Sequence, residues 1–168
     1  MSERPEATET SGPQRFQPTS TETTETFWEA TRDHDYLVQW CTACDDPVFY
    51  PREVCPHCLR ADALTWRTSS GRGRIHAMSV QHRPAHPGMA GIVPYVVALV
   101  DLDAGHDDRT VRIMSNITGV DPDDVHDGDA VRLVWEPLDD GRNLALFTPD
   151  GPATERAAAN GEGESGDA

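Results

Sequence analysis

Four cysteines in two closely spaced pairs constrain this chain more than any other feature of its sequence. They are the only cysteines present, and ten residues separate one Cys-x2-Cys turn from the other: Cys41, Cys44, Cys55 and Cys58. Each turn directs two thiolates to one side of a tight knuckle, and two such knuckles supply the tetrahedral set of sulfurs that zinc prefers. Because the protein fills all four positions, we expect a structural zinc site with no place for a substrate.

Two other uses of these cysteines remain open on spacing alone. A rubredoxin-type iron centre takes the same four sulfurs, and two disulfides would form in an oxidising compartment. The chain has no apolar run of transmembrane length, and Met1 to Thr24 lacks the cationic start and the apolar stretch of a secretory signal. We therefore predict a cytoplasmic protein, a setting that favours metal thiolates over disulfides.

The charge of the chain is its second unusual feature. The formal net charge is -15, with 29 acidic residues against 14 basic ones, and every basic residue is arginine. An acid-rich surface without lysine keeps its carboxylates hydrated and resists precipitation in concentrated salt. We therefore predict a halophilic source. A GC-rich genome would also deplete lysine, but it would not by itself explain the excess of acid.

One stretch of the chain escapes this acidic bias. Residues 61–100 hold a single acidic residue against four arginines: Arg67, Arg72, Arg74 and Arg83. In so acidic a chain, a locally basic stretch indicates an anionic ligand, or a partner surface that carboxylates would repel. The alternative is that the four arginines scatter over different faces of strands.

The pattern of polar and apolar residues divides the chain into five parts. Residues 1–24 and 151–168 hold too few apolar side chains to fold, and we expect two disordered acidic tails. Residues 25–34 predict a short helix, which must pack on the rest of the protein or on a partner. Residues 35–67 would form the zinc ribbon, with short strands at 36–40, 47–50 and 64–67.

Residues 68–150 predict a small β-barrel. Five β-rich runs are separated by clusters of glycine, aspartate and proline, at 74–82, 94–102, 110–116, 130–136 and 143–148. A capped helical turn at 121–125, with Pro122 at its first helical position, falls between the third and fourth strands. We thus expect a mainly β fold: an N-terminal helix, a rubredoxin-like zinc ribbon and a five-stranded OB-fold barrel.

Taken together, the motifs resemble the zinc-ribbon-containing OB-fold proteins of the domain-of-unknown-function 35 family. The resemblance runs from Phe27 to Phe147. In the expected ribbon it is carried by the two cysteine turns with Tyr50-Pro51-Arg52 between them. In the expected barrel it is carried by Gly71-Arg72-Gly73-Arg74-Ile75, residues 94–102, Asn116-Ile117-Thr118-Gly119-Val120 and Gly128-Asp129-Ala130-Val131. The chain departs from the family pattern at Leu59, where glycine often follows the last cysteine, and at residues 104–109, which lengthen a turn.

This resemblance implies a non-catalytic subunit that binds a thiolase-like enzyme and helps to hold or pass on an acyl-CoA, as in an acetoacetyl-CoA thiolase complex. A hydratase or an aldolase that acts on acyl-CoA is the alternative partner. The sequence agrees, because it shows no P-loop, dinucleotide-binding glycines or serine nucleophile elbow. The four arginines named above would accept the anionic coenzyme A, and Phe27, Trp28 and Tyr95 are candidate docking residues, unless they simply pack in the core.

Nucleic-acid binding is the competing function, since zinc ribbons and OB-folds both serve it. The net charge of -15 would repel phosphates, and Tyr95 is the only aromatic residue on the expected second and third strands. A free-standing enzyme is a third interpretation, which turnover of an acyl-CoA by the isolated chain would support.

Overall fold

The computed structural model describes residues 17–106 and 108–151. The two expected disordered tails therefore lie outside the described residues, except for residues 17–24 and Gly151. Residues 17–24 lead into the first helix through a turn, in which the Thr24 backbone N–H donates to the Thr21 carbonyl at 2.9 Å. No helix in the described part of the chain is long and apolar enough to cross a membrane.

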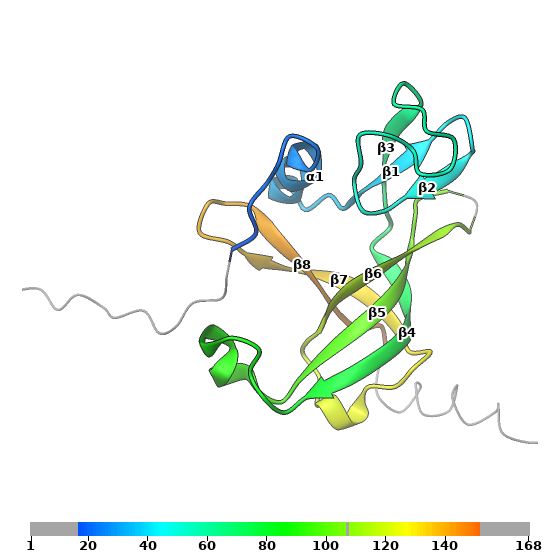
Figure 1. Cartoon of the computed structure of the whole chain (residues 1–168). Helices are drawn as coiled ribbons and strands as arrows, with labels where there is room; N and C mark the ends of the chain where they lie inside the picture. The colour runs from blue at the N-terminus through cyan, green and yellow to red at the C-terminus, as the bar shows by residue number, and fades with distance from the viewer. Residues whose placement is uncertain (1–16, 107, 152–168) are drawn as a thin grey trace, which may run out of the picture.

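The N-terminal helix and the strands of the ribbon begin and end close to the residues that the sequence predicts, and Figure 1 shows where they lie in the structure. Helix α1 spans Glu25–Ala30 and continues into a 3-10 turn, η1, at Thr31–Asp33. The ribbon is an antiparallel three-stranded sheet in the order β2-β1-β3. Its strands are β1 (Leu37–Cys41), β2 (Asp46–Val48) and β3 (Leu64–Thr68).

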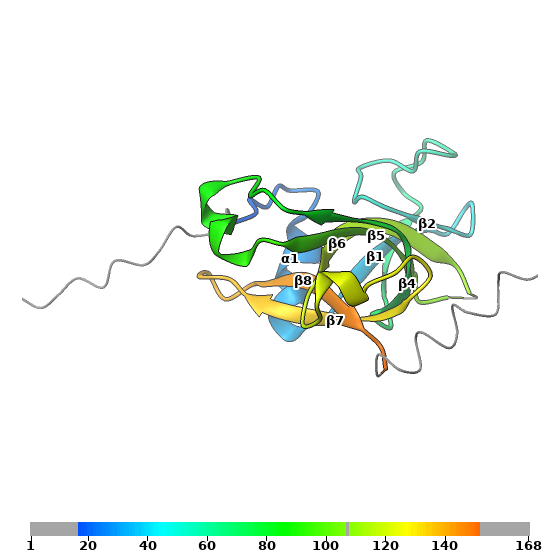
Figure 2. The same cartoon turned by 90° about the horizontal axis from the view of Figure 1, so that it is seen from below.

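A closed five-stranded barrel follows the ribbon, and its strands are β4 (Arg72–Gln81), β5 (Tyr95–Asp103), β6 (Thr110–Ile117), β7 (Ala130–Pro137) and β8 (Asn143–Pro149). The strand order is β4-β5-β6-β8-β7, with β7 paired back to β4 and β6 parallel to β8 (Figure 2). A 3-10 turn, η3 (Pro122–Asp124), lies between β6 and β7, capped by the Asp121 side chain. This topology confirms the predicted OB-fold.

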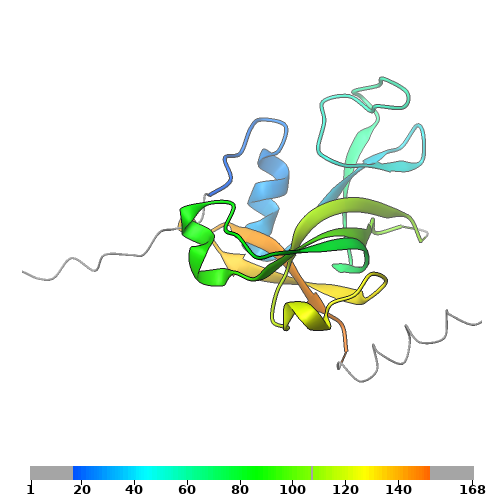
Figure 3. The ribbon, with the colours of Figure 1, turned by 60° about the horizontal axis from the view of Figure 1, so that its bottom comes forward.

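The loop between β4 and β5 contains a turn that the sequence pattern did not predict. This 3-10 turn, η2, spans Pro87–Ile92 and lies at the opposite end of the barrel from the ribbon (Figure 3). The His86 side chain caps the start of this turn, because its Nδ1 accepts a hydrogen bond from the Gly88 N–H at 3.1 Å.

The ribbon and the barrel share one hydrophobic core. Alternate residues of β5 are buried inside the barrel, as expected for a strand with one face turned to the core. Three ribbon residues, Tyr36, Val38 and Trp40, belong to the same buried cluster as the barrel residues. A second, much smaller cluster surrounds the cysteines and contains only Val48 and Ala63 as further buried members. The half of the ribbon that holds the cysteines therefore has little apolar burial of its own.

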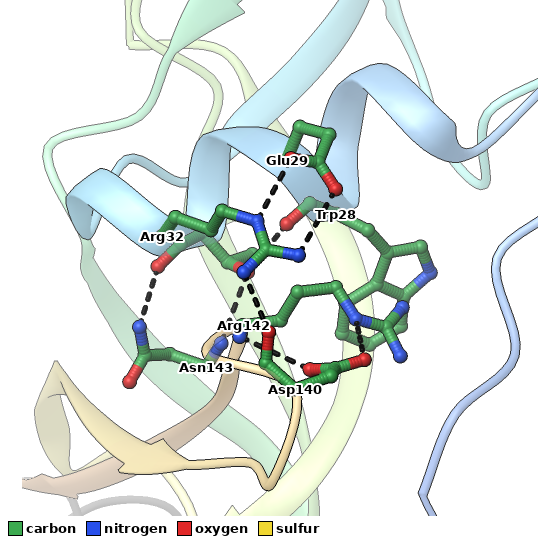
Figure 4. Close-up of polar contacts among 7 residues, drawn as sticks. Trp28, Glu29, Arg32, Asp140, Arg142 and Asn143 are labelled. Atoms are coloured by element: carbon green, nitrogen blue, oxygen red, sulfur yellow. Dashed lines mark hydrogen bonds and ion pairs between the residues drawn. The ribbon is translucent and has the colours of Figure 1, made fainter.

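Buried hydrogen bonds fasten the short helix to the hairpin between β7 and β8 (Figure 4). The Asn143 backbone N–H donates to Thr31 Oγ1 at 3.1 Å, and the Asn143 side-chain amide donates to the Thr31 carbonyl at 2.8 Å. Arg32 adds a hydrogen bond to the Asp140 carbonyl at 2.6 Å. A six-residue helix is unstable alone, so these contacts explain why it persists and which side it presents to the barrel.

Arg142 is a buried guanidinium beneath this helix. Its Nε donates to Asp140 at 2.6 Å, its Nη2 donates to the Pro18 carbonyl at 2.7 Å, and it lies 5.0 Å from the centroid of the Trp28 ring. Residues 17–24 are thus tied to the barrel by a charged side chain. The same contact holds Trp28 against the β7–β8 hairpin.

Candidate metal centre and docking surface

The four cysteine sulfurs converge at the tip of the ribbon. Cys41 and Cys58 sulfurs lie 3.6 Å apart, Cys44 and Cys55 sulfurs 3.8 Å apart, and all four lie within 4.8 Å of one another. A tetrahedron with Zn–S arms of ~2.3 Å has edges of about 3.8 Å, so the arrangement fits a four-sulfur metal site. None of the four is in a disulfide. The cysteines are therefore positioned to bind a metal, as their spacing predicts.

The protein already favours the thiolate form at one of these sulfurs. Backbone N–H groups of Cys58 and His57 help to lower the pKa of Cys55 to about 6. Hydrogen bonding with the Cys58 thiol, together with burial, raises the pKa of Cys44 to about 12. Four crowded sulfurs thus keep some of their protons, which a divalent cation would displace on binding.

The second knuckle adopts the backbone conformation that explains the glycine preference at position 59. Leu59 has a φ of 60°, in the left-handed region, and its N–H donates to the Cys55 carbonyl at 2.9 Å. Glycine adopts this conformation freely, whereas a residue with a Cβ pays roughly 1–2 kcal/mol. The Leu59 side chain points into solvent, so the departure from the family pattern leaves the knuckle intact.

An apolar pocket of about 270 Å³ lies where helix α1, the ribbon and the barrel meet. We call it the aromatic pocket, and it is lined by Thr24, Phe27, Trp28, Tyr36, Phe49, Tyr50, Pro51, Ile113, Met114, Leu144 and Ala145. The Phe27 ring meets the Trp28 and Tyr36 rings edge-on, with centroids 5.2 and 5.1 Å away. The structure thus gathers the two aromatic residues of the predicted helix into one surface with the ribbon.

Exposed apolar side chains continue this surface onto the outside of the barrel. Tyr50 is 56% exposed, Met114 64% and Leu99 37%. Leu99 and Met114 are directly opposite each other on β5 and β6, so they share one face of the sheet. We call the aromatic pocket together with Leu99 the docking face. Large exposed apolar side chains gathered in one place are typical of interaction sites.

Gln39 holds one wall of the aromatic pocket in place. It is 6% exposed on β1, its Nε2 donates to the Arg52 carbonyl at 3.0 Å, and its Oε1 accepts from the Arg52 N–H at 2.7 Å. Strand β2 ends at Val48, so this amide replaces the ladder hydrogen bonds that the backbone no longer supplies. No motif of the sequence pointed to Gln39, although a polar residue between Val38 and Trp40 in a strand is the signal of such a role.

We expect Gln39→Leu to lower the free energy of unfolding by about 1–3 kcal/mol, because it leaves the Arg52 backbone groups without their partners. Chemical denaturation monitored by tryptophan fluorescence measures this loss. Gln81→Leu is the matched control, since among the described residues its amide bonds only to the exposed Ser79 hydroxyl, two residues away on β4. Equal stability of the two variants would contradict the role of Gln39.

The four arginines of the basic stretch do not form one surface. Arg67 lies over the Trp40 ring, 3.9 Å from its centroid, and so covers the ribbon core. Arg72 and Arg74 begin β4, whereas Arg83 lies beyond the far end of that ten-residue strand, which has a length of about 30 Å at ~3.3 Å per residue. The four arginines therefore lie in three separate places: Arg67 on the ribbon, Arg72 with Arg74 at the start of β4, and Arg83 after its end.

The surroundings of Arg72 and Arg74 do not favour a phosphate between them. They line a pocket of about 490 Å³ with Arg109, but four carboxylates share it: Asp101, Asp103, Asp108 and Asp150. Arg72 forms an ion pair with Asp150, and Arg74 donates to the Gly128 carbonyl at 3.1 Å. Tyr95, at the start of β5, is only 9% exposed, so it offers little surface to a partner.

Two family models together match the chain from residue 28 to residue 136. Residues 28–65 match the family described as the rubredoxin-like zinc ribbon domain of ChsH2, and residues 66–136 match its C-terminal OB-fold domain. A Methanothermobacter thermautotrophicus protein named "DUF35 domain-containing scaffold protein" is 36% identical, over 70% of this chain and 84% of that protein. The predicted family and its two modules are thus confirmed.

Two further relatives carry enzyme names. A Thermomonospora curvata protein named "Probable enoyl-CoA hydratase alpha subunit" is 34% identical over 84% of this chain, which spans only 47% of that relative. A solved structure described as "Ltp2-ChsH2(DUF35) aldolase" has 32% identity and a TM-score of 0.67, over 79% of this chain and 98% of that one. The two family models and the 36% identical scaffold protein lead to one conclusion: the chain belongs to the DUF35 family of zinc-ribbon and OB-fold proteins.

Proposed function

We propose that this protein is a non-catalytic subunit of a cytoplasmic enzyme complex that processes acyl-CoA, and that the partner enzyme binds the docking face. The observation that carries the proposal is the exposed apolar surface of Tyr50, Leu99 and Met114 on a chain of net charge -15. Exposed apolar surfaces are typical of interaction sites, because a partner that covers them removes their side chains from water. The cysteines are taken up by the metal site, so the reacting groups for a thioester would come from the partner.

The partner that we propose first is a hydratase or an aldolase. One relative is named as the alpha subunit of an enoyl-CoA hydratase, and the similar solved structure combines Ltp2 with ChsH2 as an aldolase. These names support such a partner over the thiolase-like enzyme, for example acetoacetyl-CoA thiolase, that the sequence resemblance suggested first. In this proposal the subunit helps the partner to bind or transfer its acyl-CoA.

The ion that we propose for the ribbon is Zn²⁺, with a purely structural role. All four ligands come from the protein, so the metal would crosslink the two knuckles. No coordination position would remain open for a substrate. The small core around the cysteines cannot hold this half of the ribbon together by apolar burial alone. Metal binding then contributes directly to folding.

Affinity purification of the tagged full chain from its own cytoplasm at high salt, followed by mass spectrometry, tests the proposed function. We expect a hydratase, an aldolase or a thiolase in stoichiometric amount, and its identity selects among the three. A parallel purification with Met114→Glu should lose that enzyme. Recovery of nucleic acid instead, or of the same proteins with both baits, would contradict the proposal.

We propose further that the acidic surface adapts the protein to molar salt. With 29 acidic residues, the folded chain concentrates carboxylates that repel one another when counterions are scarce. Lowering potassium chloride from molar to about 0.1 M should therefore reduce the melting temperature markedly, as followed by circular dichroism. An unchanged melting temperature would remove the support for a halophilic origin.

A further inference from the structure

A second pocket, polar rather than aromatic, lies on the other side of the ribbon–barrel junction. Its volume is about 310 Å³, within the usual range for small-ligand sites. The residues of its wall that bear on a ligand are His34, Asp35, Ser70, Arg72, Arg132 and Trp135. They come from the residues that follow η1, from the link between β3 and β4, and from strands β4 and β7. Tyr36 lines both this pocket and the aromatic pocket, and Arg72 is one of the arginines expected to accept coenzyme A. The inference therefore deepens the proposed function and rests on it.

Two arginines face each other in this pocket. Arg72 on β4 and Arg132 on β7 are directly opposite in the strand register, and both line the pocket. Like charges in this position destabilise a sheet unless something lies between them. Arg72 pairs with Asp150 through one nitrogen, Nη1, whereas Arg132 has no hydrogen bond or ion pair with any other described residue. Both guanidinium groups therefore keep N–H donors that a ligand in the pocket could use.

The remaining walls suit an anion that carries a planar group. The Ser70 hydroxyl oxygen accepts from the Arg72 N–H at 3.3 Å, which leaves its proton available to donate. Among the residues that the structure describes, Asp35 is the only acidic residue that lines the pocket, and Asp150 reaches it only through its ion pair with Arg72. Trp135 and His34 stack on each other with centroids 5.7 Å apart, and this ring pair forms an aromatic wall of the pocket.

We propose that this polar pocket binds a phosphomonoester group, held between the guanidinium groups of Arg72 and Arg132. A phosphate matches two guanidinium forks with paired, charge-assisted hydrogen bonds, and it removes the repulsion between them. A ring attached to the phosphate would lie along the wall of His34 and Trp135. The ligand is thus either a ring-bearing phosphomonoester or free phosphate.

Calorimetric titration of the full chain at constant ionic strength tests this site with three probes: adenosine 3′-monophosphate, inorganic phosphate and adenosine. We expect the nucleotide to bind and adenosine not to bind. Tighter binding of the nucleotide than of phosphate identifies a ring-bearing ligand, whereas equal binding identifies phosphate alone. Failure of both phosphorylated probes, or binding of adenosine as tight as that of the nucleotide, overturns the proposal.

Arg132→Gln should weaken binding of the phosphorylated probe about tenfold or more, because one charged hydrogen-bonding partner is lost. Arg60→Gln is the matched control, since Arg60 is an exposed arginine of the ribbon paired with Asp62. Thermal unfolding provides a second readout: the probe should raise the melting temperature of the wild type and of Arg60→Gln, but hardly that of Arg132→Gln. Equal affinity of the two variants would overturn the assignment to Arg132.

Discussion

Replacing Cys41 by serine is expected to unfold the zinc ribbon and to abolish binding of the partner enzyme. Structural zinc sites contribute about 10–16 kcal/mol at neutral pH, which is comparable to the whole stability of an ordinary domain, and a serine hydroxyl is a poor substitute for a thiolate. The damage should reach the barrel, because Trp40, next to Cys41, is part of the shared core. Cys58→Ser should have the same effect.

Metal content, tryptophan fluorescence and partner binding together measure this result. The variants should lose the metal, shift the emission of Trp40 towards that of a solvated indole, and fail to retain the partner. Ala43→Ser is the matched control, because it adds a hydroxyl in the same knuckle at an exposed position. A Cys41→Ser protein that keeps both its metal and its partner would show that the site is not structural.

Placing a charge on the docking face is expected to disrupt the complex without unfolding the subunit. Met114→Glu and Tyr50→Asp each put a carboxylate in the middle of an apolar contact, and interface anchors of this type contribute about 2–4 kcal/mol, or roughly 30- to 1000-fold in affinity. Both side chains are more than half exposed in the isolated subunit, so its own stability should change little.

Titration of the purified partner with each variant measures the loss of affinity. Ile92→Glu is the matched control: Ile92 is 43% exposed in η2, at the opposite end of the barrel from the ribbon (Figure 3). We expect this control to bind as the wild type does. If all three variants bound the partner equally well, the docking face would lie elsewhere and the observation behind the proposed function would fail.

Much of the fold could be predicted because its signals are local. The cysteine spacing predicts two knuckles, since each turn needs only four consecutive residues to place two sulfurs. The five barrel strands follow from β-rich runs between turn residues, and the helical turn at Pro122 follows from its own capping residue. Phe27 and Trp28 were identified for a similar reason, because a short helix must bury its aromatic side somewhere.

The sequence by itself therefore determined the four cysteines that are positioned to bind a metal, the order of the elements and the family, all of which depend on residues near one another in the chain. Only the tertiary structure decided which distant residues meet. Closure of the barrel places Arg132 opposite Arg72, while the length of β4 separates Arg72 from Arg83. Likewise, the end of β2 gives Gln39 its role at Arg52. Strand register and closure come from packing of the whole core, and no local pattern contains them.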